Sequence, residues 1–166
     1  MEAFVTFFTG HLSGILSGEC IVFLISLLPV LELRGGLLAA SLLGLPYPRA
    51  LLICILGNLL PIPFVLLFIE RIVTLLERFS LTRGLALWFR RRVDRHQAGI
   101  EKYGFWGLTL FVGIPLPGTG AWTGSIVAGL LKMSPRRVVP SILLGVLLAS
   151  LIMSVVSYGL LGTLLR

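Results

Sequence analysis

Two charged residues, Glu32 and Arg34, stand inside an apolar tract and are the first candidates for chemistry. The tract runs from Cys20 to Leu45 and contains no other charged side chain. A charge at the centre of a membrane-inserted helix costs roughly 2.5–3.5 kcal/mol, so such a residue usually has a function or a buried partner. Residues i and i+2 do not face each other on a regular helix. We expect the two side chains to converge where Pro29 and the pair Gly35-Gly36 break the helix, with Arg34 as an anion receptor and Glu32 as a proton carrier. An internal salt bridge is the alternative.

A second apolar tract, Tyr103–Leu131, is interrupted by prolines and glycines, Pro115-Leu-Pro117-Gly118-Thr119-Gly120. The run from Gly118 to Gly124 matches no phosphate-loop or dinucleotide fingerprint, because no Gly-Lys follows and its third glycine, Gly124, is misplaced. A glycine-rich break that opens a half-helix leaves unpaired N–H groups at a positive dipole end, which favours an anion. The alternative is that the small residues only allow close helix packing. The predicted substrate-binding residues of this segment are Gly118, Thr119, Gly120, Trp122 and Thr123, with Trp122 lining a cavity.

Asn58 is a lone polar residue in a clean 20-residue apolar stretch, Ala50–Ile69. Such a residue bonds a neighbouring helix more often than a substrate, and we keep it as a candidate for substrate binding. Cys20 and Cys54 both fall in apolar stretches, which favours thiols buried in a bilayer over a disulfide or a metal site. No catalytic motif and no carboxylate pair on one face supports an enzyme. We expect no metal and no cofactor.

The composition indicates that the chain lies in a membrane and not in water. Of 166 residues, 57% are hydrophobic and 13% are charged, and the mean hydropathy is +1.02. Soluble domains carry about 25% charged residues, so a soluble monomer, a disordered chain and a disulfide scaffold are excluded. The net charge of +7 does not indicate nucleic-acid binding, because the basic residues are clustered. Eight of them lie between Arg71 and Lys102 and three more between Lys132 and Arg137. Such clusters stay cytoplasmic, which places residues 70–102 and 132–137 inside the cell.

These tracts predict an all-α integral membrane protein with several passes. If the tract 103–131 crossed the membrane completely, the two basic clusters would lie on opposite faces. We therefore expect it to enter and return as a re-entrant helical hairpin, with four plain spans as the alternative. The predicted elements are an amphipathic helix (3–18), a re-entrant hairpin (20–45), a transmembrane helix (50–69), a basic interfacial loop with amphipathic helices (70–102), a second hairpin (103–131) and a last transmembrane helix (138–161). No cleaved signal peptide is expected, since no basic residue precedes Arg34.

The two halves of the chain share an architecture. Placing Pro48 over Pro135, an offset of 87 residues, aligns a broken tract and a following span in each half. This predicts an inverted repeat. Repeats with broken helices indicate a transporter whose site lies where the breaks meet. Because two hairpins and two spans supply few walls for a pathway, we expect a homodimer.

Glu32-Leu33-Arg34-Gly35-Gly36, together with the run from Pro115 to Trp122, resembles the bacterial and archaeal small multi-drug export family, which is similar to the DedA/VTT superfamily. The resemblance implies inverted re-entrant repeats and movement of lipids, with Glu32 and Arg34 as functional groups. It also implies a location in the inner (cell) membrane of a prokaryote. The leading hypothesis is a transporter or flippase for an anionic amphiphile such as a polyprenyl phosphate, coupled to protons through Glu32. The alternatives are efflux of lipophilic compounds and a non-transporting membrane scaffold that binds anionic lipid.

Overall fold

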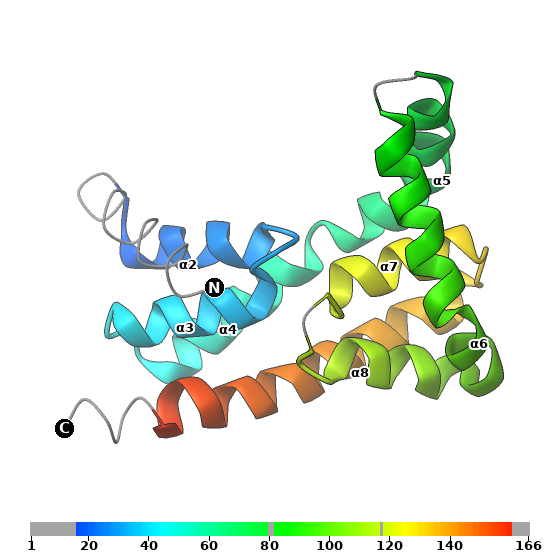
Figure 1. Ribbon diagram of the computed structural model, residues 1–166. Helices are drawn as coiled ribbons and strands as arrows, with labels where there is room; N and C mark the ends of the chain where they lie inside the picture. Colours follow the sequence, from blue (N-terminus) through cyan, green and yellow to red (C-terminus); the bar gives the residue numbers. More distant parts are fainter. Residues whose placement is uncertain (1–15, 80–81, 117, 161–166) are drawn as a thin grey trace.

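The computed structural model describes residues 16–79, 82–116 and 118–160, which form helices and no strand (Figure 1). The predicted amphipathic helix 3–18 and Pro117 therefore lie wholly or largely outside the described residues. The helices are α2 (Gly18–Leu27), α3 (Glu32–Leu42), α4 (Tyr47–Leu59), α5 (Ile62–Arg78), α6 (Arg83–Gly113), α7 (Ala121–Leu130) and α8 (Pro135–Ser154), which is followed by the π-helix η1 (Val155–Leu160).

Helices α2 and α3 form the first helix pair, joined by a break over residues 28–31 that contains Pro29. Contrary to the sequence-based expectation, Gly35 and Gly36 do not belong to the break but lie inside α3. Their role is close packing. A Cβ at Gly36 would overlap the hydroxyl of Ser26 and lie 2.8 Å from Sγ of Cys54, so glycine lets α3 approach its neighbours.

Helices α6 and α7 form the second helix pair. Helix α6 is kinked at Gly104, where φ is 51° and ψ is −117°. The part after the kink, residues 105–113, packs against α7. Residues 114–120 form the second break, in which Gly118 (φ 80°) and Gly120 (φ 141°) adopt backbone conformations that favour glycine.

Among the described residues, two helical stretches are long and apolar enough to cross a membrane, Tyr47–Arg78 and Pro135–Ser157. The first comprises α4 and α5, interrupted at Leu60 and Pro61, so it is longer than the predicted span 50–69. Proline lacks an N–H, but it fits the first turn of a helix and lets α5 begin directly. The predicted interfacial loop 70–102 contains helices, as expected: the end of α5, up to Arg78, and the first part of α6, from Arg83.

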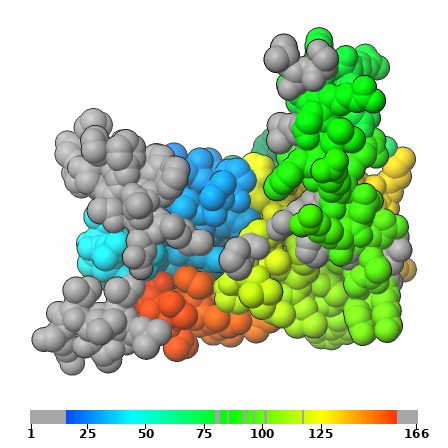
Figure 2. All heavy atoms as spheres, in the orientation of Figure 1, coloured from blue at the N-terminus to red at the C-terminus, as the bar shows by residue number. Residues whose placement is uncertain are grey.

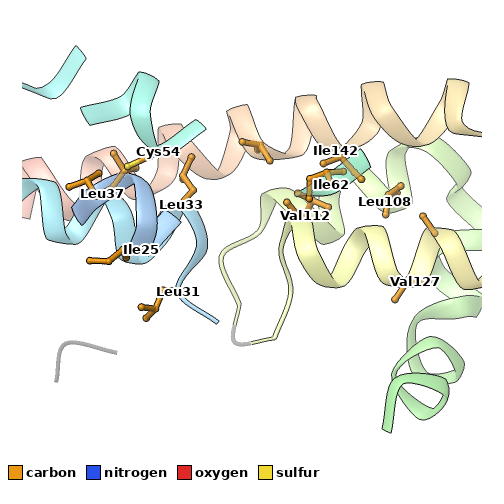
Figure 3. Packing of buried hydrophobic residues seen from close by; sticks show 14 of the residues in the cluster. Ile25, Leu31, Leu33, Leu37, Cys54, Ile62, Leu108, Val112, Val127 and Ile142 are labelled. Atoms are coloured by element: carbon orange, nitrogen blue, oxygen red, sulfur yellow. The ribbon is translucent and has the colours of Figure 1, made fainter. Parts of the chain in front are cut away.

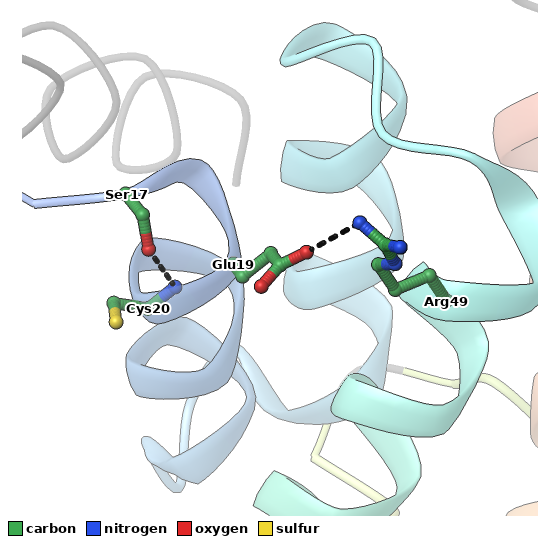
Figure 4. Close-up of polar contacts among 4 residues, drawn as sticks. All are labelled: Ser17, Glu19, Cys20 and Arg49. Atoms are coloured by element: carbon green, nitrogen blue, oxygen red, sulfur yellow. Dashed lines mark hydrogen bonds and ion pairs between the residues drawn. The ribbon is translucent and has the colours of Figure 1, made fainter.

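Ion pairs tie the helix ends together at two places. At one end of the molecule, Nη1 of Arg49 lies 3.0 Å from Oε1 of Glu19, which joins the start of α4 to the start of α2 (Figure 4). At the other end, Nζ of Lys132 lies 2.9 Å from Oε1 of Glu70, which joins the α7–α8 turn to α5. The end of α5 and the start of α6 project from this side as an arm (Figure 2). The two basic segments of the chain therefore adjoin each other.

The core extends along both helix pairs and the long helices beside them (Figure 3). Ile25, Leu33, Leu37 and Cys54 are buried in one half, and Leu108, Val112, Val127 and Ile142 in the other. The outer faces of α4, α5 and α8 are apolar as well and remain exposed, with Leu52, Leu67 and Leu151 each 63–70% exposed. An apolar interior combined with an apolar exterior suits lipid as the surrounding medium.

Candidate functional site

The two breaks meet in the middle of the molecule (Figure 1). We call this place the break junction. It comprises Glu32 and Arg34 together with the residues that they contact, which are Ile114, Leu116 and Thr119 of the second break and Trp122 at the start of α7. Glu32 and Arg34 are 6% and 8% exposed. Glu32 begins α3 with a φ of 50°, a conformation uncommon for residues other than glycine. Such strain often occurs at functional sites.

Arg34 donates hydrogen bonds to the backbone of the second break. Its Nη1 lies 2.6 Å from the carbonyl oxygen of Leu116. Its Nη2 lies 3.0 Å from the carbonyl oxygen and 3.2 Å from the hydroxyl of Thr119, and 3.4 Å from the carbonyl oxygen of Ile114. Ile114 is the C-cap of α6, where carbonyl groups lack helical partners and the helix dipole favours a cation. Arg34 therefore supplies hydrogen-bond donors to the carbonyl groups of the second break, which begins where α6 ends.

Glu32 contacts the opposite end of the same break. Its Oε1 accepts a hydrogen bond of 3.2 Å from the backbone N–H of Trp122, in the first turn of α7. The positive end of a helix dipole stabilises a carboxylate in this position. A Cβ at Gly120 would overlap this carboxylate, so glycine is required there for the contact to form.

The expected convergence of Glu32 and Arg34 takes another form in the structure. In the described part of the chain the two side chains form no ion pair within 4.0 Å. Instead, the acid binds the N-terminal end of α7, and the base binds the C-terminal end of α6. The positive helix end predicted to hold an anion thus holds a carboxylate of the protein itself.

Trp122 connects the break junction to an apolar cavity of about 680 Å³. Its indole Nε1 donates a hydrogen bond of 3.2 Å to the carbonyl oxygen of Leu27 at the end of α2. The prediction that Trp122 lines a cavity is confirmed. The cavity lies between the first break and α5 and has no charged side chain in its wall, which is formed by Leu27, Leu28, Pro29, Leu60, Pro61, Phe64, Val65, Phe68, Ile72 and Trp122.

The structure also places the other residues that the sequence predicts for the site. Pro115 and Gly118 are part of the second break, and Thr123 is half-buried on α7. Asn58 is 3% exposed near the end of α4, and its Oδ1 has no hydrogen-bond partner among the described residues. A buried amide oxygen without a partner costs free energy, which keeps Asn58 a candidate for binding a ligand.

Sequence reasoning missed the carbonyl groups that hold Arg34, because every residue has a carbonyl and no side chain marks these. It also missed Ser26 and Cys54 as neighbours of Gly36. The sequence signal for these carbonyl groups is the presence of two prolines near position 116, which interrupt the helix and expose carbonyl groups around them.

Comparison with known proteins gives one assignment. No curated protein and no solved structure matches the chain. The family model of the small multi-drug export proteins matches residues 32–152. The match begins at Glu32, ends within α8 and contains every residue of the break junction. The chain belongs to the small multi-drug export protein family.

Proposed function

We propose that the chain exports lipophilic compounds across a membrane, and that its two helix pairs are re-entrant hairpins arranged as an inverted repeat. The observation that carries this proposal is the apolar cavity next to a buried, hydrogen-bonded carboxylate. Membership of an export family and two helices long enough to span a bilayer agree with it.

Equivalent glycine contacts in the two halves support the repeat. Gly57 and Gly145 are 88 residues apart (145 − 57). A Cβ at either position would lie 2.9 Å from a carbonyl oxygen and 2.7–2.9 Å from a Cβ atom of the preceding helix pair. The atoms belong to Phe23 and Ser26 in the first half and to Thr109 and Val112 in the second, which are 86 residues apart (109 − 23 and 112 − 26). These contacts favour an offset of 86 before the breaks and of 88 after them, where the alignment of the prolines gives 87. The stretch between the two contact points is therefore two residues longer in the second half.

The ion pair between Lys132 and Glu70 supports the membrane topology. It brings the two basic segments to one end of the molecule, which the positive-inside rule assigns to the cytoplasm. Single cysteines at Lys102 and Ser134, in a chain with Cys20 and Cys54 replaced by serine, should react with an impermeant thiol reagent from the same side of an oriented membrane. Labelling from opposite sides would contradict the second re-entrant hairpin.

The cavity indicates the class of substrate. Its volume of about 680 Å³ lies in the range of pockets for drug-sized ligands. Because its wall carries no charged group, it suits a lipophilic molecule. We propose that Glu32 couples transport to protons: a proton on the carboxylate weakens its contact with the start of α7, and Trp122 transmits this change to the cavity.

Transport of an anionic amphiphile such as a polyprenyl phosphate is the second candidate. It would require Arg34 and the amides of α7 to exchange their present partners for the ligand. We rank it below export of lipophilic compounds for this reason. A non-transporting scaffold would use the basic segments alone and would not need the break junction.

We also propose that the protein acts as a homodimer. The outer wall of the cavity is exposed, with Leu60 53%, Phe64 61% and Phe68 43% exposed. A second copy that packs against this wall would close the cavity toward lipid. Cross-linking of a Phe64→Cys variant in vesicles should give a covalent dimer, and its absence at all protein densities would contradict this interface.

The experiment that tests the function uses protein reconstituted in vesicles with an imposed proton gradient. We expect gradient-driven movement of the lipophilic cation tetraphenylphosphonium or of a neutral lipophilic dye. Glu32→Gln should abolish this movement, whereas Glu19→Gln, which removes a surface acid, should preserve it. Equal transport by both variants would refute the role of Glu32.

A second pair of variants tests the cavity. Leu60→Trp places a large side chain in the cavity and should slow transport at least several-fold. Leu56→Trp is the matched control, since Leu56 lies in the last turn of α4, four residues before Leu60, is 62% exposed and does not line the cavity. If both variants transport equally well, the cavity is not the path of the substrate.

A further inference from the structure

A second cavity lies on the other side of the second helix pair, and the proposed export does not use it. Its volume is about 370 Å³. It lies along α6 on both sides of the kink and ends at the second break, and its lining is formed by Arg95, Gly99, Ile100, Tyr103, Gly107, Leu110, Phe111, Ile114, Leu116 and Thr119. We call this cavity the kink groove.

The kink at Gly104 creates the groove by folding α6 back on itself. A Cβ at Gly107 would lie 2.9 Å from the carbonyl oxygen of Gly99 and 3.1 Å from Cα of Ile100. The two parts of α6 therefore touch nearly backbone to backbone beside the kink. The apolar side chains beyond this contact form the walls of the groove.

The two ends of the kink groove differ in polarity. Arg95 lines one end, and in the part of the chain that the structure describes it forms no ion pair within 4.0 Å. Thr119 lines the other end, where its carbonyl oxygen and hydroxyl bind Arg34. The kink groove thus has a cationic side chain without an ion-pair partner at the surface, and its apolar walls extend from there toward the break junction.

Aromatic and basic residues around the groove mark the level of lipid headgroups. Tyr103 and Trp106 are 60% and 62% exposed, and Nζ of Lys102 lies 5.3 Å from the centre of the Tyr103 ring. Tryptophan and tyrosine gather at membrane interfaces, and basic side chains nearby attract anionic lipids.

We propose that the kink groove binds an anionic membrane phospholipid, with its phosphate on Arg95 and one acyl chain along α6 toward Thr119. The charge complementarity of Arg95 and the apolar walls select this occupant. The end of the acyl chain then lies against Leu116 and Thr119, whose carbonyl groups accept hydrogen bonds from Arg34. The lipid therefore packs against the break junction and stabilises it. This inference rests on the proposed membrane placement but not on the export activity.

Photolabelling tests the proposal directly, without substrate and without a proton gradient. The protein is reconstituted with phosphatidylglycerol that carries a photoreactive group at the end of one acyl chain, and labelled peptides are identified by mass spectrometry. We expect label in residues 107–119, and less label from phosphatidylcholine with the same reactive chain. Arg95→Gln should lower labelling by phosphatidylglycerol about five-fold, equivalent to about 1 kcal/mol for one basic group near the surface. Arg83→Gln, the same change at an exposed site of α6 outside the groove, should not.

Two glycine variants separate occupancy of the groove from effects on folding. A Cβ at Gly99 or at Gly84 would meet no atom within 4 Å, and both residues lie on α6. Gly99→Leu should fill the groove and remove the label, whereas Gly84→Leu should leave it unchanged. Unchanged labelling in Gly99→Leu, or equal labelling by the two lipids, would overturn the proposal. Loss of label on addition of the exported compound would also overturn it, because the groove would then be a substrate site. Failure of transport with labelling intact would refute only the proposed function.

Discussion

Replacing Gly120 by alanine tests the break junction most directly, because it disturbs the backbone and the Glu32 contact together. Gly120 has a φ of 141° and a ψ of −174°, a conformation that costs other residues about 1–3 kcal/mol. The added methyl group would also overlap the carboxylate of Glu32. The carboxylate must then leave the N–H of Trp122, which costs about 1.5–3 kcal/mol for a hydrogen bond to a charged group. Together the two effects destabilise the protein by about 2.5–6 kcal/mol.

The free energy of unfolding in mixed micelles, followed by far-ultraviolet circular dichroism, measures this loss. Gly44→Ala is the control for backbone strain alone, because Gly44 has a φ of 66° and a Cβ there would meet no atom within 4 Å. We expect it to cost about 1–2 kcal/mol. In a Glu32→Ala background the overlap disappears, so Gly120→Ala should cost about 1.5–3 kcal/mol less than in the native chain. An equal cost in both backgrounds would refute the contact between Glu32 and α7.

Three further predictions concern other contacts of the fold. Arg34→Lys keeps the charge but loses the fork of donors that reaches Leu116 and Thr119, and should lower the free energy of unfolding by about 2 kcal/mol; no loss in the same micelle assay would contradict this role of the guanidinium. Gly36→Ala should cost about 1–3 kcal/mol through overpacking, and a thermal unfolding temperature equal to that of the native chain would refute close packing at α3. The Glu70 carboxylate raises the pKa of Lys132 above its usual value of 10.5. The ion pair therefore contributes stability below pH 10.5 that is lost as the pH rises through the raised pKa, and Glu70→Gln should remove this pH dependence from thermal unfolding curves.

The positions of the two breaks could be predicted from the sequence because proline acts locally. Pro29 and Pro115 lack the N–H that a helix interior uses, which disfavours a continuous helix, and both lie in the breaks. Glycine is different, since the same residue type serves in a turn and in a tightly packed helix. The sequence therefore predicts Gly35 and Gly36 in the first break, whereas they lie in α3 against residues of other helices. Only tertiary contacts distinguish these two uses.

The candidate site shows the same limit. The cost of a charge in an apolar tract was sufficient to select Glu32 and Arg34. Their partners could not be inferred, because three of the groups that bind them are backbone carbonyls and one is a backbone amide. The cavity beside Trp122 depends on how α5 lies against the first break, which involves residues about 35 to 45 positions apart and leaves no local pattern.

The contacts of Glu32 and Arg34 have a consequence for biosynthesis. Their partners follow 80 to 90 residues later in the chain. At a synthesis rate of about 5–20 residues per second, this separation corresponds to roughly 4–18 s. During that interval the first helix pair has left the ribosome with a carboxylate and a guanidinium that lack their final partners, and neither group is stable alone in hydrocarbon. The insertion machinery must therefore hold this pair in a polar environment until α7 has been made, and a nascent chain truncated before Trp122 should remain bound to that machinery.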